Sequence, residues 1–219
     1  MGKRLLLVEG KDDEQVVKHL CRAHGIEDRF LIEQPRQVDG LLGGDEGGVE
    51  RLLDQVPIRL RESDVERLAV ILDADTDAQH RWVQLRERLR RAGIPAVPDK
   101  PEDMSIVIDF RNRIGDPVRL GVWIMPDNRL PGMLENFLMF LVPEGDKLLA
   151  HVDRFLTGIP LVDRPFSDSA SSKARMHAFL AVQEKPGKPL GLAITFCYLD
   201  AKREYVRPFL DWLQAVLVN

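Results

Sequence analysis

Acidic side chains follow two short apolar runs, and together they could form a cation site. The first run, residues 5–8, is followed by Glu9, and the second, residues 68–72, is followed by Asp73 and Asp75. Several carboxylates in a small volume repel one another unless a cation neutralises them, and a cluster of hard oxygen ligands suits Mg²⁺ or Mn²⁺. The sequence therefore predicts a site for one of these metals if the two runs bring the carboxylates together.

The predicted secondary structure is expected to bring the carboxylates of the two runs together. Both runs have the length and composition of buried strands, and helical periodicity follows each of them. Strands that alternate with helices usually pair in parallel, so their carboxyl ends share the edge where open α/β folds bind ligands. Asp73 and Asp75 should point to the same side because side chains alternate along a strand. Asp13, in the first turn of the next helix, is expected to reach the same cavity.

The whole chain of 219 residues is predicted to be an α/β protein. We expect a mainly parallel sheet flanked by helices in residues 1–142, and an α-helical C-terminal extension, residues 143–219, packed on it. Strands are predicted at residues 4–8, 29–33, 67–72, 105–110 and 119–124. Helices are predicted at residues 12–24, 49–61, 77–92 and 133–141, and near residues 146–156, 171–184 and 204–218. A glycine-rich, acidic stretch at residues 40–48 is expected to be a loop.

Two later acidic residues are further candidate ligands. Asp127 follows the strand predicted to end at residue 124, so it would approach the same edge of the sheet, although Pro126 and Asn128 also favour a simple turn there. Glu135 begins a largely apolar helix, where it either stabilises the positive end of the helix dipole or points at the cluster. Both alternatives stay open for each residue.

Simpler explanations exist for the main acidic motifs. Glu9 could be a solvated strand end, and Asp77 could cap the helix that follows it. Capping explains one aspartate of the second motif, but not three. A calcium-binding EF-hand loop would need Gly and Glu where Ala78 and Gln84 stand, and no Walker phosphate-binding motif occurs in the sequence.

The basic residues indicate nucleic-acid binding less clearly than the acidic residues indicate a metal site. The formal net charge is −4 and the isoelectric point is about 5.8, which does not indicate a nucleic-acid-binding protein by itself. The polar face of the helix at residues 77–92 is nevertheless rich in arginine, and Arg81, Arg88 and the early Lys11 are candidate contacts to a phosphate backbone. A second arginine group, Arg111, Arg113 and Arg119, follows. A solvated helix face is an equally good interpretation of these charges.

Residues 5–17 and 68–75 resemble the two acidic motifs of the Toprim domain. This module is shared by topoisomerases, bacterial primases, ribosomal-RNA maturases and the overcoming-lysogenization-defect nucleases. The whole chain also resembles a family of small bacterial proteins with a Toprim-like fold, through residues 122–128, 132–136 and 173–178. The resemblance implies one or two Mg²⁺ (or Mn²⁺) ions and hydrolysis of phosphodiester bonds in DNA or RNA.

The resemblance also assigns roles to residues. Glu9 would be a general base or shared ligand, and Lys173 would offset negative charge in the transition state, although an ordinary surface lysine is the simpler explanation there. The candidate metal ligands are Glu9, Asp13, Asp73, Asp75, Asp127 and Glu135. Two alternatives stay open: a non-catalytic effector module that partners a separate ATPase in phage defence, and a metal-dependent phosphatase acting on a small substrate.

The sequence also predicts the cellular location of the protein. The sequence shows no signal peptide and no apolar run of the roughly 18 residues that a membrane helix needs, so we expect a cytoplasmic protein without a membrane contact. Cys21 and Cys197 have no partners at metal-ligand spacing and are expected to be buried free thiols. The sequence does not indicate an oligomeric state.

Overall fold

The structure is a computed structural model that describes residues 2–35, 48–95, 97–99, 106–112 and 114–219. Most of the predicted loop at residues 40–48 lies outside the described residues, as do Ser105 and Arg113. Within the described part of the chain, no helix is both long and apolar enough to cross a membrane.

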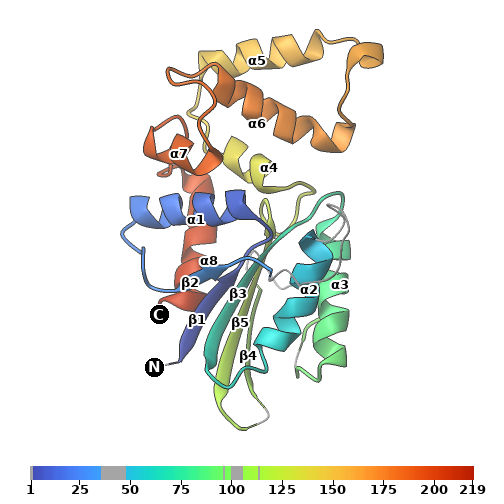
Figure 1. Cartoon of the computed structure of the whole chain (residues 1–219), viewed down its shortest axis with the longest axis vertical. Helices are drawn as coiled ribbons and strands as arrows, with labels where there is room; N and C mark the ends of the chain where they lie inside the picture. Colours follow the sequence, from blue (N-terminus) through green and yellow to red (C-terminus); the bar gives the residue numbers. More distant parts are fainter. Residues whose placement is uncertain (1, 36–47, 96, 100–105, 113) are drawn as a thin grey trace, which may run out of the picture.

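Five strands of the described chain form one sheet in the order β2-β1-β3-β5-β4 (Figure 1). Strand β1 pairs in parallel with β2 and β3, and β3 pairs in parallel with β5, whereas β4 runs antiparallel beside β5. The strands are β1 (Lys3–Leu7), β2 (Leu31–Glu33), β3 (Val65–Asp73), β4 (Ile106–Arg111) and β5 (Pro117–Met125). The predicted mainly parallel sheet is therefore confirmed, with strand ends that differ by a few residues.

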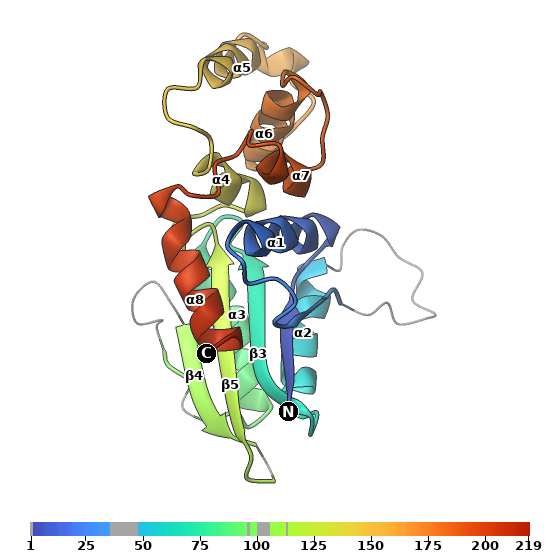
Figure 2. The same cartoon turned by 90° about the vertical axis from the view of Figure 1, so that its left-hand side faces the viewer.

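Helices cover both faces of this sheet, which confirms the predicted fold class. Helices α2 and α3 pack on one face, and α1 and α8 pack on the other (Figures 1 and 2). Helices α4 to α7 lie mainly beyond the carboxyl ends of the parallel strands (Figure 1). The helices are α1 (Lys11–Ala23), α2 (Gly48–Arg59), α3 (Ala78–Arg91), α4 (Leu134–Met139), α5 (Lys147–Thr157), α6 (Ser171–Ala181), α7 (Leu190–Thr195) and α8 (Arg207–Leu217).

Alternation along the strands produces two separate cores. In β1, Leu5 and Leu7 pack against α2 and α3, whereas Leu6 packs against α1 and α8. Because both faces are covered, the later part of each of β1, β3 and β5 is a continuous apolar run, as expected for a buried parallel sheet, whereas the edge strand β4 alternates between buried and exposed residues. Helix α7 was not predicted from the sequence. It is only six residues long, and it packs against α1.

Three arginines hold the carboxyl end of α8 against the sheet. Arg4, Arg67 and Arg119 lie side by side in register on β1, β3 and β5. Their guanidinium groups donate hydrogen bonds to backbone carbonyls of residues 215–219, at distances of 2.8 to 3.1 Å. The last carbonyls of a helix have no partner within the helix and carry its negative dipole end, so three cations stabilise this terminus.

This arrangement corrects one expectation, about Arg119, and shows how α8 packs. Arg119 is bound to α8 and to Asp109, so it is not part of a free basic surface. The predicted division after residue 142 remains a prediction, but α8 is not a peripheral addition, because it covers the sheet of the N-terminal part. At Gly121 of β5 an added Cβ atom would lie 2.4 Å from a methyl group of Val216, so only glycine lets α8 approach this closely.

The two cysteines differ in exposure. Cys21 lies on the buried side of α1, as expected, but Cys197 is exposed. Cys197 lies in the turn that ends α7, with a positive φ of 59°. The prediction of a second buried thiol is therefore wrong, because this apolar stretch of sequence ends its helix at the surface.

Candidate metal centre

Glu9 and Asp73 meet at the carboxyl ends of two neighbouring parallel strands. The register pairs Leu7 of β1 with Val70 of β3, so the residues that follow each strand lie side by side. Glu9 Oε1 accepts a hydrogen bond from the backbone N–H of Asp73 at 2.9 Å. The predicted convergence of these two motifs is thus confirmed.

Asp13 reaches this edge from the first turn of α1. Its Oδ2 atom accepts a hydrogen bond from the backbone N–H of Gly10 at 3.1 Å, and the residue is only 8% exposed. Side chains in a helix point back toward its amino end, which here is the end next to Glu9. The sequence-based position of Asp13 beside the cluster is therefore confirmed.

Helix α4 adds a fourth carboxylate. Asp73 Oδ1 accepts a hydrogen bond from the backbone N–H of Leu134 at 3.0 Å, which fixes the amino end of α4 at the site. The next residue, Glu135, is 5% exposed, and it has no hydrogen bond or ion pair among the described residues. A buried carboxylate is costly unless it is protonated or neutralised by a nearby positive charge, so Glu135 belongs with the other acidic groups of this edge.

The pKa values of Glu9, Asp13 and Asp73 are all raised at this edge. Burial raises the pKa of Asp73 to about 9, and the negative charges of Glu9, Asp13 and Glu135 add to this effect. Burial and the charge of Glu9 raise the pKa of Asp13 to about 7. Burial also raises the pKa of Glu9, although its hydrogen bond from Asp73 and the nearby Arg81 oppose the shift. Such mutual elevation is typical of carboxylates that share protons or a cation.

The chemistry of these side chains fits a hard divalent cation. Glu9 and Asp73 each use one oxygen for a backbone hydrogen bond, and the other oxygen accepts none from the described residues. As the side chains stand, no three His, Cys, Asp or Glu groups in the described ranges are arranged to hold a metal ion. These side chains would therefore have to rotate toward a cation to coordinate it.

Asp75 differs from the other predicted ligands. Strand β3 ends at Asp73, and Asp75 has a positive φ of 54°, so the expectation that the two side chains point the same way does not hold. The backbone N–H of Asp75 donates to Gly132 O at 2.9 Å, while its carboxylate is paired with the guanidinium of Arg81. An added Cβ atom at Gly132 would lie 2.8 Å from the side chain of Asn136, so glycine is required at this contact.

Arg81 lies inside the protein and not on the exposed face where the sequence placed it. It is 7% exposed, and its Nε atom donates to the carbonyl of Asp73 at 2.8 Å. Its position in the first turn of α3 explains this orientation, because helical side chains point back toward the amino end. The same rule could have located Arg81 at the acidic edge from the sequence.

The other two residues predicted to contact nucleic acid, Arg88 and Lys11, differ in their ion-pair partners. Arg88 is paired with Glu50 and Asp54, because α2 packs beside α3 and presents acidic side chains to it. Lys11 is exposed at the start of α1, next to the site, and is paired with Glu14. Lys11 therefore remains a candidate for contact with a phosphate, whereas Arg88 would first have to leave its acidic partners.

The structure places Asp127 in a turn, which was the alternative interpretation of its sequence. Its Oδ1 atom accepts hydrogen bonds from the backbone N–H groups of Arg129 and Leu130 at 3.1 and 2.8 Å. Asn128 is buried, and its Oδ1 accepts a hydrogen bond from Ile124 N at 2.6 Å. The carboxylate of Asp127 is thus engaged in closing this turn and is not held with the cluster.

Lys173 is exposed in the first turn of α6. The neighbouring Ser172 accepts a hydrogen bond from Asn136 Nδ2 at 2.8 Å, so the amino end of α6 lies against α4, beside Glu135. The part of the chain that the structure describes contains no ion pair of Lys173. The sequence did not predict this contact between α6 and α4, which places the neighbour of Lys173 against the helix that carries Glu135.

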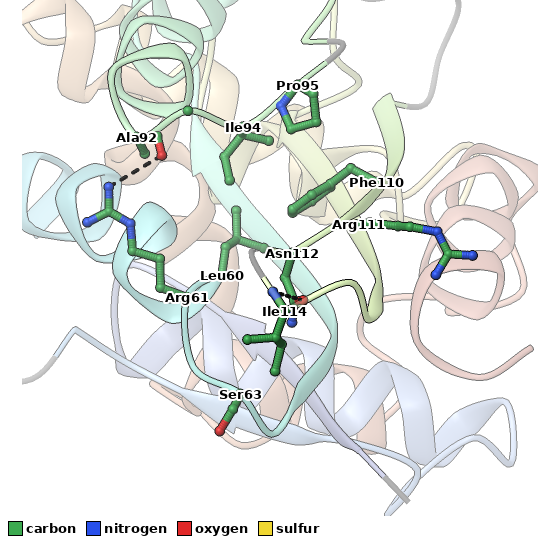
Figure 3. Close-up of a pocket in the computed structure, with 11 residues that line it drawn as sticks. Leu60, Arg61, Ser63, Ala92, Ile94, Pro95, Phe110, Arg111, Asn112 and Ile114 are labelled. Atoms are coloured by element: carbon green, nitrogen blue, oxygen red, sulfur yellow. Dashed lines mark hydrogen bonds between the residues drawn. The ribbon is translucent and has the colours of Figure 1, made fainter.

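One of the cavities among the described residues, at the opposite edge of the sheet, does not resemble a catalytic site. It has a volume of about 130 Å³ and lies between the ends of α2 and α3 and the β4–β5 hairpin. Leu60, Ile94 and Phe110 point into it, whereas Arg111 points away (Figure 3). Its walls are mainly apolar, so the carboxylates at the other edge remain the candidate centre.

The fold and this edge define an α/β protein with a buried acidic site at the carboxyl ends of its central parallel strands. The chain belongs to the family described as protein of unknown function DUF3226, whose model matches residues 3–218. No curated protein and no solved structure matches the chain significantly.

Proposed function

We propose that this protein is a divalent-metal-dependent nuclease that hydrolyses phosphodiester bonds in DNA or RNA. The observation that carries the proposal is the convergence of Glu9, Asp13, Asp73 and Glu135 at one buried edge, where burial and mutual repulsion raise the pKa of the first three. The resemblance of residues 5–17 and 68–75 to Toprim motifs supports the same class of chemistry.

The residues of the site have distinct roles in this proposal. When bound, Mg²⁺ or Mn²⁺ supplies Lewis acidity to a phosphoryl oxygen and favours ionisation of water. Asp13, Asp73 and Glu135 would hold the cation with their carboxylate oxygens. Glu9, whose pKa is raised, accepts a proton from the attacking water. Lys173 reaches the phosphate from the amino end of α6 and offsets its developing negative charge.

A second candidate is a phosphatase acting on a small substrate. The observation that favours it is the burial of Asp13 and Glu135, because deeply placed carboxylates are easier to reach for a small phosphate ester than for a duplex. This enzyme would use the same cation and the same carboxylates, so the choice of substrate decides between the two candidates.

The test is a cleavage assay with purified protein on plasmid, single-stranded DNA, RNA and a phosphomonoester, with Mg²⁺, Mn²⁺ or a chelator. We expect metal-dependent cleavage of a nucleic acid, and Glu9→Gln should lower its rate at least about 100-fold. The matched control is Asp64→Asn, an exposed acidic residue just before β3 at the opposite edge, which should cleave like the wild type.

The outcomes separate the candidates. Cleavage of the phosphomonoester alone would support the phosphatase. Metal binding without cleavage of any substrate would contradict both enzymes and favour a non-catalytic module that partners a separate ATPase. Cleavage that resists the chelator would rule out the proposed chemistry.

A further inference from the structure

Two lysines share one aromatic ring at the surface beside α7. The Nζ atoms of Lys185 and Lys188 lie 4.8 and 5.6 Å from the ring centroid of Phe196. Among the residues that the structure describes, neither ammonium group is paired with a carboxylate, not even with the adjacent Glu184. The ring attracts each cation, but two cations at one ring also repel each other. An anion bound by both lysines would relieve this repulsion.

The segments that carry these side chains are fixed to each other. Phe196 stacks on Tyr198, with ring centroids 5.8 Å apart and an interplanar angle of 19°. The hydroxyl oxygen of Tyr198 accepts a hydrogen bond from the backbone N–H of Lys185 at 3.1 Å. The backbone N–H of Gly187 donates to the carbonyl of Leu180 at 3.1 Å, which ties the same loop to the end of α6. The backbone of the lysine loop is therefore positioned before a ligand arrives, and this lowers the cost of binding.

Helix α1 connects the lysine pair to the acidic edge. Helix α7 packs on α1 (Figures 1 and 2), and Nδ1 of His19 on α1 lies 2.7 Å from Oγ1 of Thr195, the residue before Phe196. An added Cβ atom at Gly191 of α7 would lie 2.7 Å from the ring of His19, so glycine is needed for this close approach. Asp13 and His19 stand on the same helix, about 9 Å apart along its axis at a rise of about 1.5 Å per residue. One extended ligand could thus contact both regions.

The charges favour a phosphate backbone as that ligand. The carboxylates of the acidic edge repel phosphates, so a nuclease needs cations beside them to hold its substrate. Arg81 and Arg88 are already paired with carboxylates, whereas Lys185 and Lys188 are not. Each ammonium group offers three N–H donors, which suit the oxygens of a phosphodiester.

We propose that Lys185 and Lys188, held at the ring of Phe196, bind the phosphodiester backbone of the nucleic-acid substrate beside the acidic edge. This inference rests on the proposed function, because it takes the substrate of the nuclease as the ligand. The lysines contact a phosphate other than the one that is cleaved. They therefore contribute to substrate binding and not to the chemical step.

The test is the binding of fluorescently labelled DNA and RNA oligonucleotides of about 20 nucleotides, measured by anisotropy over a series of salt concentrations. All proteins carry Glu9→Gln and the buffer contains Mg²⁺, so that cleavage is slow. Adding Lys185→Gln with Lys188→Gln should lower the affinity at least about tenfold and reduce the slope of log affinity against log salt by about 1.5 to 2. The matched control, Arg61→Gln with Arg91→Gln, also removes two exposed positive charges, but at the opposite edge of the sheet, and should change affinity by no more than about twofold.

Steady-state kinetics with Glu9 in place separate binding from chemistry. Lys185→Gln with Lys188→Gln should raise KM at least about tenfold and change kcat by no more than about twofold. Phe196→Leu keeps an apolar side chain but removes the ring, so it should raise KM in the same direction by a smaller factor. A loss confined to kcat would contradict the binding role.

Other outcomes would also overturn the inference. Equal affinities and salt slopes of the lysine and arginine double variants would remove the lysine pair from the substrate path and leave the proposed nuclease standing. Displacement of the oligonucleotide by polyglutamate at a similar concentration would indicate an acidic protein partner instead, and displacement by inorganic phosphate at a similar concentration would indicate a free-phosphate site. Tight binding by the wild type that depends on both lysines, without cleavage of any substrate, would refute the nuclease and still support this surface as a contact to nucleic acid.

Discussion

Asp73 is a carboxyl group that the fold leaves protonated at neutral pH. Its pKa rises from an ordinary value of 3.8 to about 9, mainly because it is buried and then because Glu9 and Asp13 repel its charged form. The folded protein therefore holds a proton that the unfolded chain releases above pH 4. Stability then decreases as pH rises, because the folded state binds more protons than the unfolded state in this range.

We therefore predict that the metal-free protein loses thermal stability as pH is raised from about 5 to 9, through the pKa values of Asp13 and Asp73. Asp73→Asn should flatten this dependence, because an amide does not titrate. Melting temperatures measured in a chelating buffer at several pH values test the prediction. Melting temperatures of the wild type that rise over this range would contradict it.

The effect of Lys173 on turnover distinguishes a catalytic role from that of an ordinary surface lysine. If it offsets charge on the phosphate, Lys173→Ala should lower turnover at least about 100-fold, because the loss of one transition-state donor has this effect. Mn²⁺ binding should not change, and stability should change by no more than about 0.5 kcal/mol. Steady-state kinetics, with Lys202→Ala as an exposed control, measure the difference. Cleavage by Lys173→Ala at the wild-type rate would remove this residue from the mechanism.

At the scale of elements, the packing of α8 depends on the arginines of three strands. Arg4, Arg67 and Arg119 come from positions 4, 67 and 119, and only the register of the sheet lines them up. Each donates to carbonyls that the helix itself leaves unpaired. The end of α8 is therefore fixed by side chains distant in sequence and not by a local capping motif.

Arg67→Ala should lower the free energy of unfolding by about 1 to 3 kcal/mol, because it leaves the carbonyl of Val216 at the end of α8, which lies in a part-buried hydrogen bond, without its charged donor and also removes the exposed hydrogen bond to Asn219. The control is Arg207→Ala, which removes only an exposed ion pair with Asp211 on the same helix and should change stability by less than about 1 kcal/mol. Urea unfolding measures both. Equal effects of the two substitutions would show that the arginine row does not hold α8.

At the scale of the whole molecule, the sheet and the C-terminal helices form one structure. Residues of β1, β3 and β5 share a single core with α8, including Leu6, Ile71, Trp123 and Phe209. The ring centroids of Trp123 and Phe209 lie 5.3 Å apart in an edge-to-face contact. The acidic edge belongs to this unit too, since α4, which carries Glu135, packs in the same core and contacts α6.

Residues 1–142 alone should therefore not fold cooperatively. Without α8, the sheet face that carries Ile71 and Trp123 would be exposed to water, and its burial is the main source of stability for that layer. Circular dichroism and thermal unfolding of this segment test the prediction, with the full chain as the control. A cooperative transition in the shorter segment would support the division after residue 142 as a true domain boundary.

The sequence by itself determined the sheet, most of its helices and the meeting of Glu9 with Asp73. These features follow from local information: apolar strand runs, helical periodicity, and the rule that parallel strands end at one edge. The tertiary structure decided the remaining features. It turned Asp75 toward Arg81, placed Asp127 in a turn, and brought Glu135 beside Asp13. These outcomes depend on where a strand ends and which helix packs over it, and such contacts between distant residues leave no periodic signal in the sequence.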